Sequence, residues 1–321
     1  MWKLIAATQD VKATSVQDVS ALFEREDVQF WIDVEAPDRN ELESLAAALR
    51  VDGEAVDDAL AGEQRSRVDD YDDYAFVVTY SMLGDSNHGG EDLHKLAVIC
   101  GARFILTVHA EGVGAIDAMR RRAEKNARGA FEDGPGGLLY GILDQIVDNY
   151  LLYIDAIETD VDRLEDRSLH KDCSDAVLVE ASALRRTLAD LRHLAVAQDQ
   201  LINAIVSDDF PFMSKSLSFH FNHVRQHLMI VVEFTDKLRD RLHGVRDNYS
   251  FVLAHRTNEI MRVLTVFASI LLPLSLLTSV YGMNVAMWPS PSESYGIWIV
   301  LLVMLGMAGV LFWYFKRKDW L

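Results

Sequence analysis

The segment Tyr281-Gly282-Met283-Asn284 is the part of the sequence best suited to bind a metal cation. Gly282 permits tight backbone geometry, so main-chain carbonyl oxygens can turn toward a ligand. Asn284 adds a neutral amide oxygen. The segment therefore predicts a group of neutral oxygen ligands at the end of a helix.

A stripe of small, amide, hydroxyl and apolar side chains precedes this segment at helical spacing. Its members are Asn258, Met261, Leu264, Thr265, Ala268, Leu272, Ser275 and Ser279. Polar groups in lipid seek protein or water, so several copies of the stripe around one axis would line a pore. The alternative is that Ser275, Thr278 and Ser279 bond back to helix carbonyls or permit close helix packing.

Three histidines, His220, His223 and His227, recur at spacings of three and four and would share one helix face. Imidazole favours zinc, nickel or copper over magnesium. The simpler interpretation is a solvated helix face. A run of four aspartates within residues 69–73 allows the same two interpretations, cytosolic cation sensing or solvated surface near a turn.

Two uncharged apolar stretches, residues 263–281 and 295–315, are each long enough to cross a hydrocarbon core of about 30 Å. Lys and Arg flank the pair but are missing from the outer loop, residues 285–294, which predicts cytoplasmic termini. A basic cytosolic tail, residues 316–321, follows the second span. Pro273 lies within the first span and removes one helical hydrogen bond, which is compatible with a kink or hinge.

A heptad-like pattern leads straight into the first span. Between Ser214 and Leu272 the only helix breaker is Gly244, so we expect a single helix of about 68 residues, roughly 100 Å long. Two earlier segments, residues 143–164 and 177–205, repeat the same spacing and predict an antiparallel helix pair. Such a rod can couple cytosolic events to a membrane gate, or it can be a passive stalk.

Residues 1–135 have the pattern of a mixed α/β cytosolic domain. The predicted strands are Phe30–Val34, Ala75–Tyr80, Leu93–Ile99 and Phe104–Val108, with helices around Glu41–Leu49 and Val113–Ala123. The Gly134-Pro135-Gly136-Gly137 cluster marks the predicted boundary to a helical stalk, residues 136–257.

Composition narrows the possible functions. The chain has 321 residues, and 49 acidic against 31 basic residues give a net charge of −18, which argues against a nucleic-acid partner. Cys100 and Cys173 are too few and too far apart for a zinc site of the CxxC kind. No phosphate-binding glycine loop, GxSxG turn or HExxH helix is present, so we expect neither an enzyme nor a cofactor.

Four segments together resemble the C-terminal hairpin of the CorA family of divalent-cation channels, part of the 2-TM-GxN superfamily that includes the ZntB zinc transporters. They are residues 258–265, 272–275, 281–284 and 314–321. The resemblance is closest over residues 247–321, and the order of elements upstream agrees. It implies a homopentameric funnel in a bacterial inner membrane: an α+β cytosolic domain, long coiled-coil-like stalk helices and a two-helix transmembrane hairpin.

The resemblance also implies roles for single residues. In a pore-lining helix over residues 258–284, Asn284 and the carbonyls of Gly282 and Met283 would form the outer selectivity ring. Met261 and Leu272 match the family's hydrophobic constrictions, with Asn258 and Ser275 as polar rings. Asp247 falls at the acidic cytosolic entrance of the pore. Asp85 matches one side of the family's regulatory Mg²⁺ site, and His223 stands where an acidic residue would form the other.

Three functions follow from these features. The first is potential-driven entry of Mg²⁺, with Co²⁺ or Ni²⁺ as further cargo, through a pentameric channel. The second is zinc transport of the ZntB kind, favoured by the histidines and by an outer loop in which Glu293 is the only carboxylate. The third is a membrane-anchored sensor or scaffold that conducts nothing.

Overall fold

The computed structural model describes residues 2–7, 15–62, 65–82, 93–110, 112–170, 173–283, 295–318 and 320. The chain divides into two compact units. The first comprises Met1–Arg167 and Asp175–Val245, and the second comprises Ser168–Ser174 and Arg246–Leu321.

A mixed sheet of six described strands forms the centre of the first unit, in the order β1-β2-β6-β5-β4-β3. The strands are β1 (Trp2–Ala6), β2 (Phe30–Glu35), β3 (Arg67–Asp70), β4 (Tyr74–Met82), β5 (Leu93–Gly101) and β6 (Phe104–His109). Only β2 and β6 pair in parallel; the other neighbours are antiparallel. The four predicted strands are present, because their β-branched and aromatic runs fit a sheet buried on both faces.

Several short elements were missed by the pattern analysis. The two edge strands, β1 and β3, have only five and four residues, and β3 has the polar sequence RVDD. Short, polar edge strands carry little periodic signal. The missed helices α1 (Val16–Phe23) and α3 (Gly53–Leu60) have eight residues each, whereas the predicted helices were observed as α2 (Arg39–Leu49) and α4 (Gly114–Lys125). A four-residue helix, α5 (Ala127–Ala130), follows α4.

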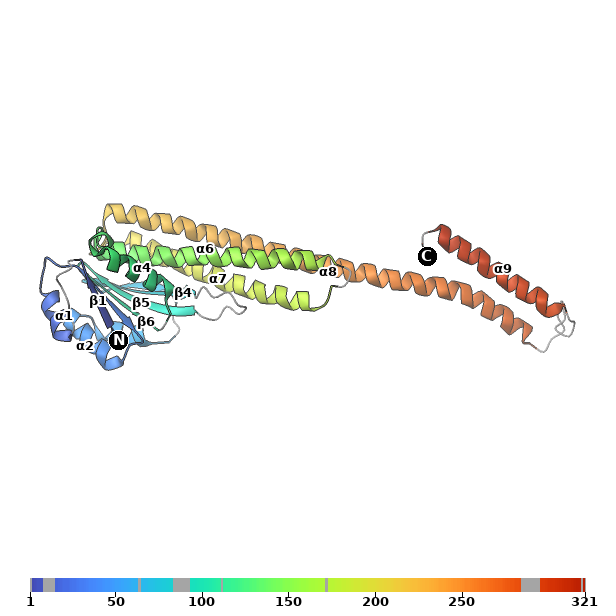
Figure 1. The fold of residues 1–321 in the computed structure, drawn as a ribbon, viewed down its shortest axis with the longest axis horizontal. Helices are drawn as coiled ribbons and strands as arrows, with labels where there is room; N and C mark the ends of the chain where they lie inside the picture. Colours follow the sequence, from blue (N-terminus) through green and yellow to red (C-terminus); the bar gives the residue numbers. More distant parts are fainter. Residues whose placement is uncertain are drawn as a thin grey trace. The chain divides into compact units, whose positions relative to one another are not determined.

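Helices cover both faces of the sheet (Figure 1). One face packs against α1, α2 and α3 in a single apolar cluster that includes Phe76, Leu106 and Leu45. The other face meets the long helices through a buried polar contact: the Tyr150 hydroxyl donates to the Tyr80 carbonyl of β4 at 2.7 Å. This hydrogen bond satisfies a buried phenol, which would otherwise be costly to desolvate.

Three long helices pack against one another in the first unit: α6 (Gly134–Ser168), α7 (Ala176–Ser207) and the first part of α8 (Lys215–Tyr281). Their predicted apolar seams are buried almost throughout. On α8 the buried seam runs from Leu217 to Val245, whereas Tyr249 and Val252, which continue the same spacing, are half-buried. The heptad-like pattern therefore marks packing within this chain only as far as Val245.

Ion pairs connect these three helices in every combination. Arg241 of α8 contacts Glu165 of α6 at 2.6 Å, Arg225 of α8 contacts Asp199 of α7 at 2.9 Å, and Arg167 of α6 contacts Glu180 of α7 at 2.6 Å. All are partly exposed, so each contributes at most about 1 kcal/mol. They fix helix register more than they stabilise the fold.

Among the described residues, two helices are long and apolar enough to cross a membrane, and the second unit holds both apolar segments: the end of α8 and α9 (Gly296–Arg317). Helix α8 has 67 residues, close to the predicted length, and it continues through Pro273 without a break. Figure 1 shows α9 running back in the direction opposite to the end of α8. Only 6% of each apolar window is buried in a single chain.

We predict that Gly136→Ala destabilises the first unit by about 1–3 kcal/mol, the usual cost of overpacking. An added Cβ would lie 2.8 Å from the Phe212 carbonyl oxygen and 2.5 Å from Leu217, and backbone cannot rotate away. Gly141→Ala is the matched control, because its Cβ would meet only the flexible end of the Met119 side chain. Thermal unfolding of both variants, followed by circular dichroism, checks this; equal losses would contradict it.

Candidate functional site

The end of α8 carries the predicted cation-selecting segment. The helix ends at Tyr281; the Gly282 amide donates to the Thr278 carbonyl at 2.9 Å, and the Met283 amide donates to the Val280 carbonyl at 3.2 Å. A Cβ on Gly282 would lie 3.3 Å from the Thr278 oxygen, so glycine fits this close helix end with least crowding. Asn284 and the outer loop lie outside the described residues.

The predicted pore-lining stripe is exposed in a single chain. Met261, Leu264 and Leu272 have 60%, 67% and 69% of their surface exposed. The other members of the stripe are exposed as well: Asn258, Thr265, Ala268, Ser275 and Ser279. An exposed apolar surface of this extent is covered by lipid or by other protein when the molecule is stable.

Two threonine hydroxyl groups of this region donate hydrogen bonds to carbonyls of their own helix. Thr265 donates to the Met261 carbonyl at 2.7 Å, and Thr278 donates to the Ser275 carbonyl at 2.9 Å. These two bonds agree with the alternative interpretation of the sequence, in which helix hydroxyl groups bond back to their own backbone. At Thr265 the back-bond turns the hydroxyl toward its own helix, so its methyl group is the part left to face outward.

The predicted cytosolic entrance is the α8 segment before the first span. Asp247 is exposed there. Eleven residues later the helix presents Asn258 and then Glu259, whose carboxylate lies 3.8 Å from the His255 ring. These polar groups and Arg256 occupy consecutive turns of an exposed helix, as expected for a segment between a packed stalk and a membrane span.

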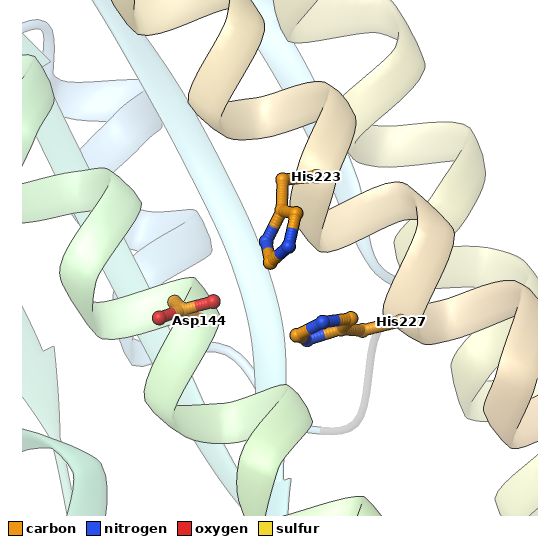
Figure 2. Close-up of side chains that lie close together, drawn as sticks. All are labelled: Asp144, His223 and His227. Atoms are coloured by element: carbon orange, nitrogen blue, oxygen red, sulfur yellow. The ribbon is translucent and has the colours of Figure 1, made fainter.

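The predicted regulatory residues separate into two groups. Asp85 lies outside the described residues, so the structure gives no partner for it. His223 and His227 lie together, and both face Asp144 of α6 (Figure 2). The histidine face is only partly solvated, because His220 and His227 are half-buried. Sequence reasoning missed Asp144, since nothing in a heptad pattern says which residue of a neighbouring helix faces a given turn.

A buried charged cluster lies on the sheet around Asp33, which is 2% exposed. Its carboxylate accepts hydrogen bonds from Thr107 at 2.7 Å, from His109 Nε2 at 3.0 Å and from Arg120 at 3.0 Å. His109 Nδ1 faces the Ala110 carbonyl, so both ring nitrogens meet acceptors and the imidazolium satisfies both. Burial opposes charge on both partners, but their mutual hydrogen bond and attraction lower the pKa of Asp33 and raise the pKa of His109. Every group is used internally, which is the arrangement of a structural pair.

Comparison with known proteins then decides the family. The model of the family described as "CorA-like Mg2+ transporter protein" matches residues 26–317. The chain belongs to this family. It is a divalent-cation transporter of the CorA-like family and a membrane protein with two C-terminal apolar helices, and it is not an enzyme.

Relatives named for the transport of different metal ions resemble the chain. The cobalt/magnesium transport protein CorA of Thermotoga maritima is 26% identical over 314 residues, which cover 98% of this chain and 89% of that protein. The zinc transport protein ZntB of Pectobacterium carotovorum is 23% identical over 269 residues, covering 84% and 81%. The complete structure of the CorA magnesium transporter of Methanocaldococcus jannaschii matches with a TM-score of 0.85 at 22% identity, covering 99% and 98%. The CorA-like fold predicted from the sequence is confirmed.

We predict that the Asp33–His109 pair makes stability depend on pH. His109 has a raised pKa in the folded chain, so its contribution is complete below the ordinary value of 6.5 and is lost as pH rises through the folded value. Asp33 has a lowered pKa, so its contribution exists above the ordinary value of 3.8 and is lost as pH falls. His109→Gln should therefore lower Tm most between these two values, by the equivalent of about 1–3 kcal/mol.

The measurement is thermal unfolding of the full chain in detergent across this pH range. The difference in Tm between wild type and His109→Gln should shrink as pH rises above 6.5. His243→Gln, a change at an exposed histidine of α8, controls for general effects. A difference that stays constant with pH would contradict the assignment of an imidazolium.

Proposed function

We propose that the chain assembles as a homopentameric channel for passive Mg²⁺ influx, with Co²⁺ and Ni²⁺ as further cargo. The observation that carries the proposal is the continuous helix α8, which brings an exposed, partly polar stripe to the Tyr281-Gly282-Met283 end. A stripe that mixes Asn258, Ser275 and Ser279 with apolar side chains suits the axis of an assembly better than contact with lipid. Five copies would surround one conduction path.

Selection in this proposal rests on neutral oxygen ligands. Asn284, together with the carbonyls of Gly282 and Met283, would form an outer ring that holds a hydrated dication through its water. A ring of bare carboxylates would release the ion slowly, whereas neutral amides favour throughput. The membrane potential supplies about 2.3 kcal/mol per charge per 100 mV, or twice that for a dication.

Further roles along the chain complete the proposal. Met261 and Leu272 would be hydrophobic constrictions, and Asp247 would attract cations to the cytosolic entrance. The proposed segments are a cytosolic domain (1–135), a stalk (136–257), a pore-lining helix (258–284), an outer loop (285–294), a second span (295–315) and a cytoplasmic tail (316–321). Both termini would face the cytoplasm of a bacterial inner membrane, as the flanking Lys and Arg residues indicate.

Zinc transport is the second candidate. It is favoured by the likeness to a zinc transport protein ZntB and by an outer loop with Glu293 as its only carboxylate. A mouth with few carboxylates concentrates dications weakly. Cargo selection then depends more on the amide and carbonyl ring than on electrostatic attraction.

We predict that Asn284→Ala lowers Mg²⁺ flux into proteoliposomes by about 10-fold or more. A hydrogen bond to a charged group contributes about 1.5–3 kcal/mol, and alanine cannot make such a bond to the hydrated ion. Asn203→Ala, at an exposed position of α7, is the matched control and should leave flux unchanged. Flux of Mg²⁺, Co²⁺, Ni²⁺ and Zn²⁺ is measured for each variant. Zn²⁺-dominated flux would favour the second candidate, and an intact pentamer without flux would favour a scaffold.

We also predict that Leu272→Ser raises Mg²⁺ flux, since a hydroxyl ring would wet a constriction that an apolar ring keeps dry. Leu271→Ser is the matched control: Leu271 is similarly exposed, at 57% against 69%, but lies outside the stripe. The measurement is initial flux at equal amounts of reconstituted pentamer. Equal effects of the two substitutions would show that the stripe does not face the conduction path.

A further inference from the structure

A cluster of metal-ligating side chains lies between α6 and α8 in the first unit, outside the membrane-spanning segments. One ligand atom each from Asp144, His223 and His227 lies within 4.8 Å of the other two. Figure 2 shows the two imidazole rings and the carboxylate pointing toward one another. All three side chains belong to one chain, so the cluster needs no second copy to be complete.

Regular packing positions the three groups. His223 and His227 are one turn apart on α8, and their ring centroids are 4.4 Å apart at an angle of 61°. The neighbouring Val224 and Leu228 are fully buried in the helix seam, which fixes the rotation of α8 at this turn. On α6, Leu143 is fully buried beside Asp144 in the same way. The cluster therefore stands on rigid elements rather than on loops.

One ring nitrogen of the cluster, and one of the neighbouring His220, lack the hydrogen-bond partners that buried polar atoms normally have, whereas His223 is exposed. The Nδ1 atoms of His227 and His220 are buried without a hydrogen-bond partner in the structure. Among the described residues, none donates a hydrogen bond to the Asp144 carboxylate. Burial and then the nearby charge of Asp148 raise the pKa of Asp144, while the three histidines oppose this. Unsatisfied buried polar groups are rare in native proteins and point to an absent ligand.

The chemical types of the three side chains indicate which metal ions they can bind. Two neutral imidazoles and a carboxylate suit Zn²⁺, Co²⁺, Ni²⁺ or Cu²⁺, whereas Mg²⁺ prefers six oxygen ligands in an octahedron. With metal–ligand bonds of about 2.0–2.1 Å, tetrahedral ligand atoms lie about 3.3 Å apart. The spacing of up to 4.8 Å therefore closes with side-chain shifts of roughly 1 Å. Three protein ligands leave one position for water, as in exchangeable zinc sites.

We propose that Asp144, His223 and His227 bind one transition-metal dication per chain of the Zn²⁺, Co²⁺ or Ni²⁺ class, and that the ion links α6 to α8. The site is separate from the proposed conduction path, and the proposal does not depend on which ion the chain transports. It differs from an Mg²⁺ site shared between copies in its imidazole ligands and in its completeness within one chain.

The test is a Co²⁺ titration of the metal-stripped full chain in detergent, with a large excess of Mg²⁺ to occupy oxygen-ligand sites. We expect visible absorption from one histidine-bound Co²⁺ per chain, displaced by Zn²⁺ and not by more Mg²⁺. His223→Ala and His227→Ala should each weaken binding by about 100-fold or more, since losing even an outer partner of a metal ligand costs 10–100-fold. His243→Gln, at an exposed position of the same helix, should bind as the wild type does.

A second readout is independent of absorption. Zn²⁺ should raise the Tm of the wild type and of His243→Gln, because a ligand of the folded state stabilises it, and should leave Asp144→Asn unchanged. Wild-type Co²⁺ binding in folded His223→Ala and His227→Ala, displacement by Mg²⁺ or an equal Tm rise in Asp144→Asn would each overturn the proposal. Unchanged Mg²⁺ flux in Asn284→Ala would contradict the proposed channel but would leave these binding results untouched, so the two proposals fail separately.

Discussion

Backbone hydrogen bonding within one helix is the constraint on which the organisation of this transporter depends. Lipid offers no partner for an amide or a carbonyl, and a helix can cross a membrane because it satisfies its polar backbone internally. Helix α8 begins at Lys215 and continues to Tyr281 with this ladder unbroken except at Pro273. A single element thus belongs to a water-soluble bundle at one end and to an apolar span at the other.

The apolar side chains at the two ends of α8 are covered in different ways. From Leu217 to Val245 the seam is covered by α6 and α7 of the same chain. Beyond Val245 most apolar side chains of α8 are exposed in a single chain, and Val266 is an exception. The information for covering the first part lies within the chain, whereas the second part depends on lipid or protein outside the single chain. This difference explains why the same heptad-like spacing has two structural meanings along one helix.

The sequence predicted the long helices, the central strands and the CorA-like hairpin, because each rests on a long periodic or apolar signal. It missed β1, β3, α1 and α3, which are too short for such a signal. It identified His220, His223 and His227 by spacing but not Asp144, since pairing between helices depends on rotation and register that emerge only from packing. The roles of Asn258, Leu272 and Asn284 remain predictions, because the periodicity of one chain does not define what an exposed stripe faces.

Pro273 has a consequence for the rotation of α8 about its own axis. Without an amide hydrogen, this residue cannot donate to the carbonyl of Ser269, one turn earlier, in the middle of an apolar span. A free carbonyl is tolerated at that depth only where water or a neighbouring protein group can reach it. With 3.6 residues per turn, this acceptor lies on the side of Ser269 and Pro273, about a quarter of a turn from the middle of the stripe. Ser269 and Pro273 are half-buried in a single chain and Val266, on the same side, is buried, whereas the stripe is exposed. The free carbonyl thus gives a reason, independent of the stripe's side chains, for this side of α8 to be covered by protein, which leaves the stripe on the open side of the helix.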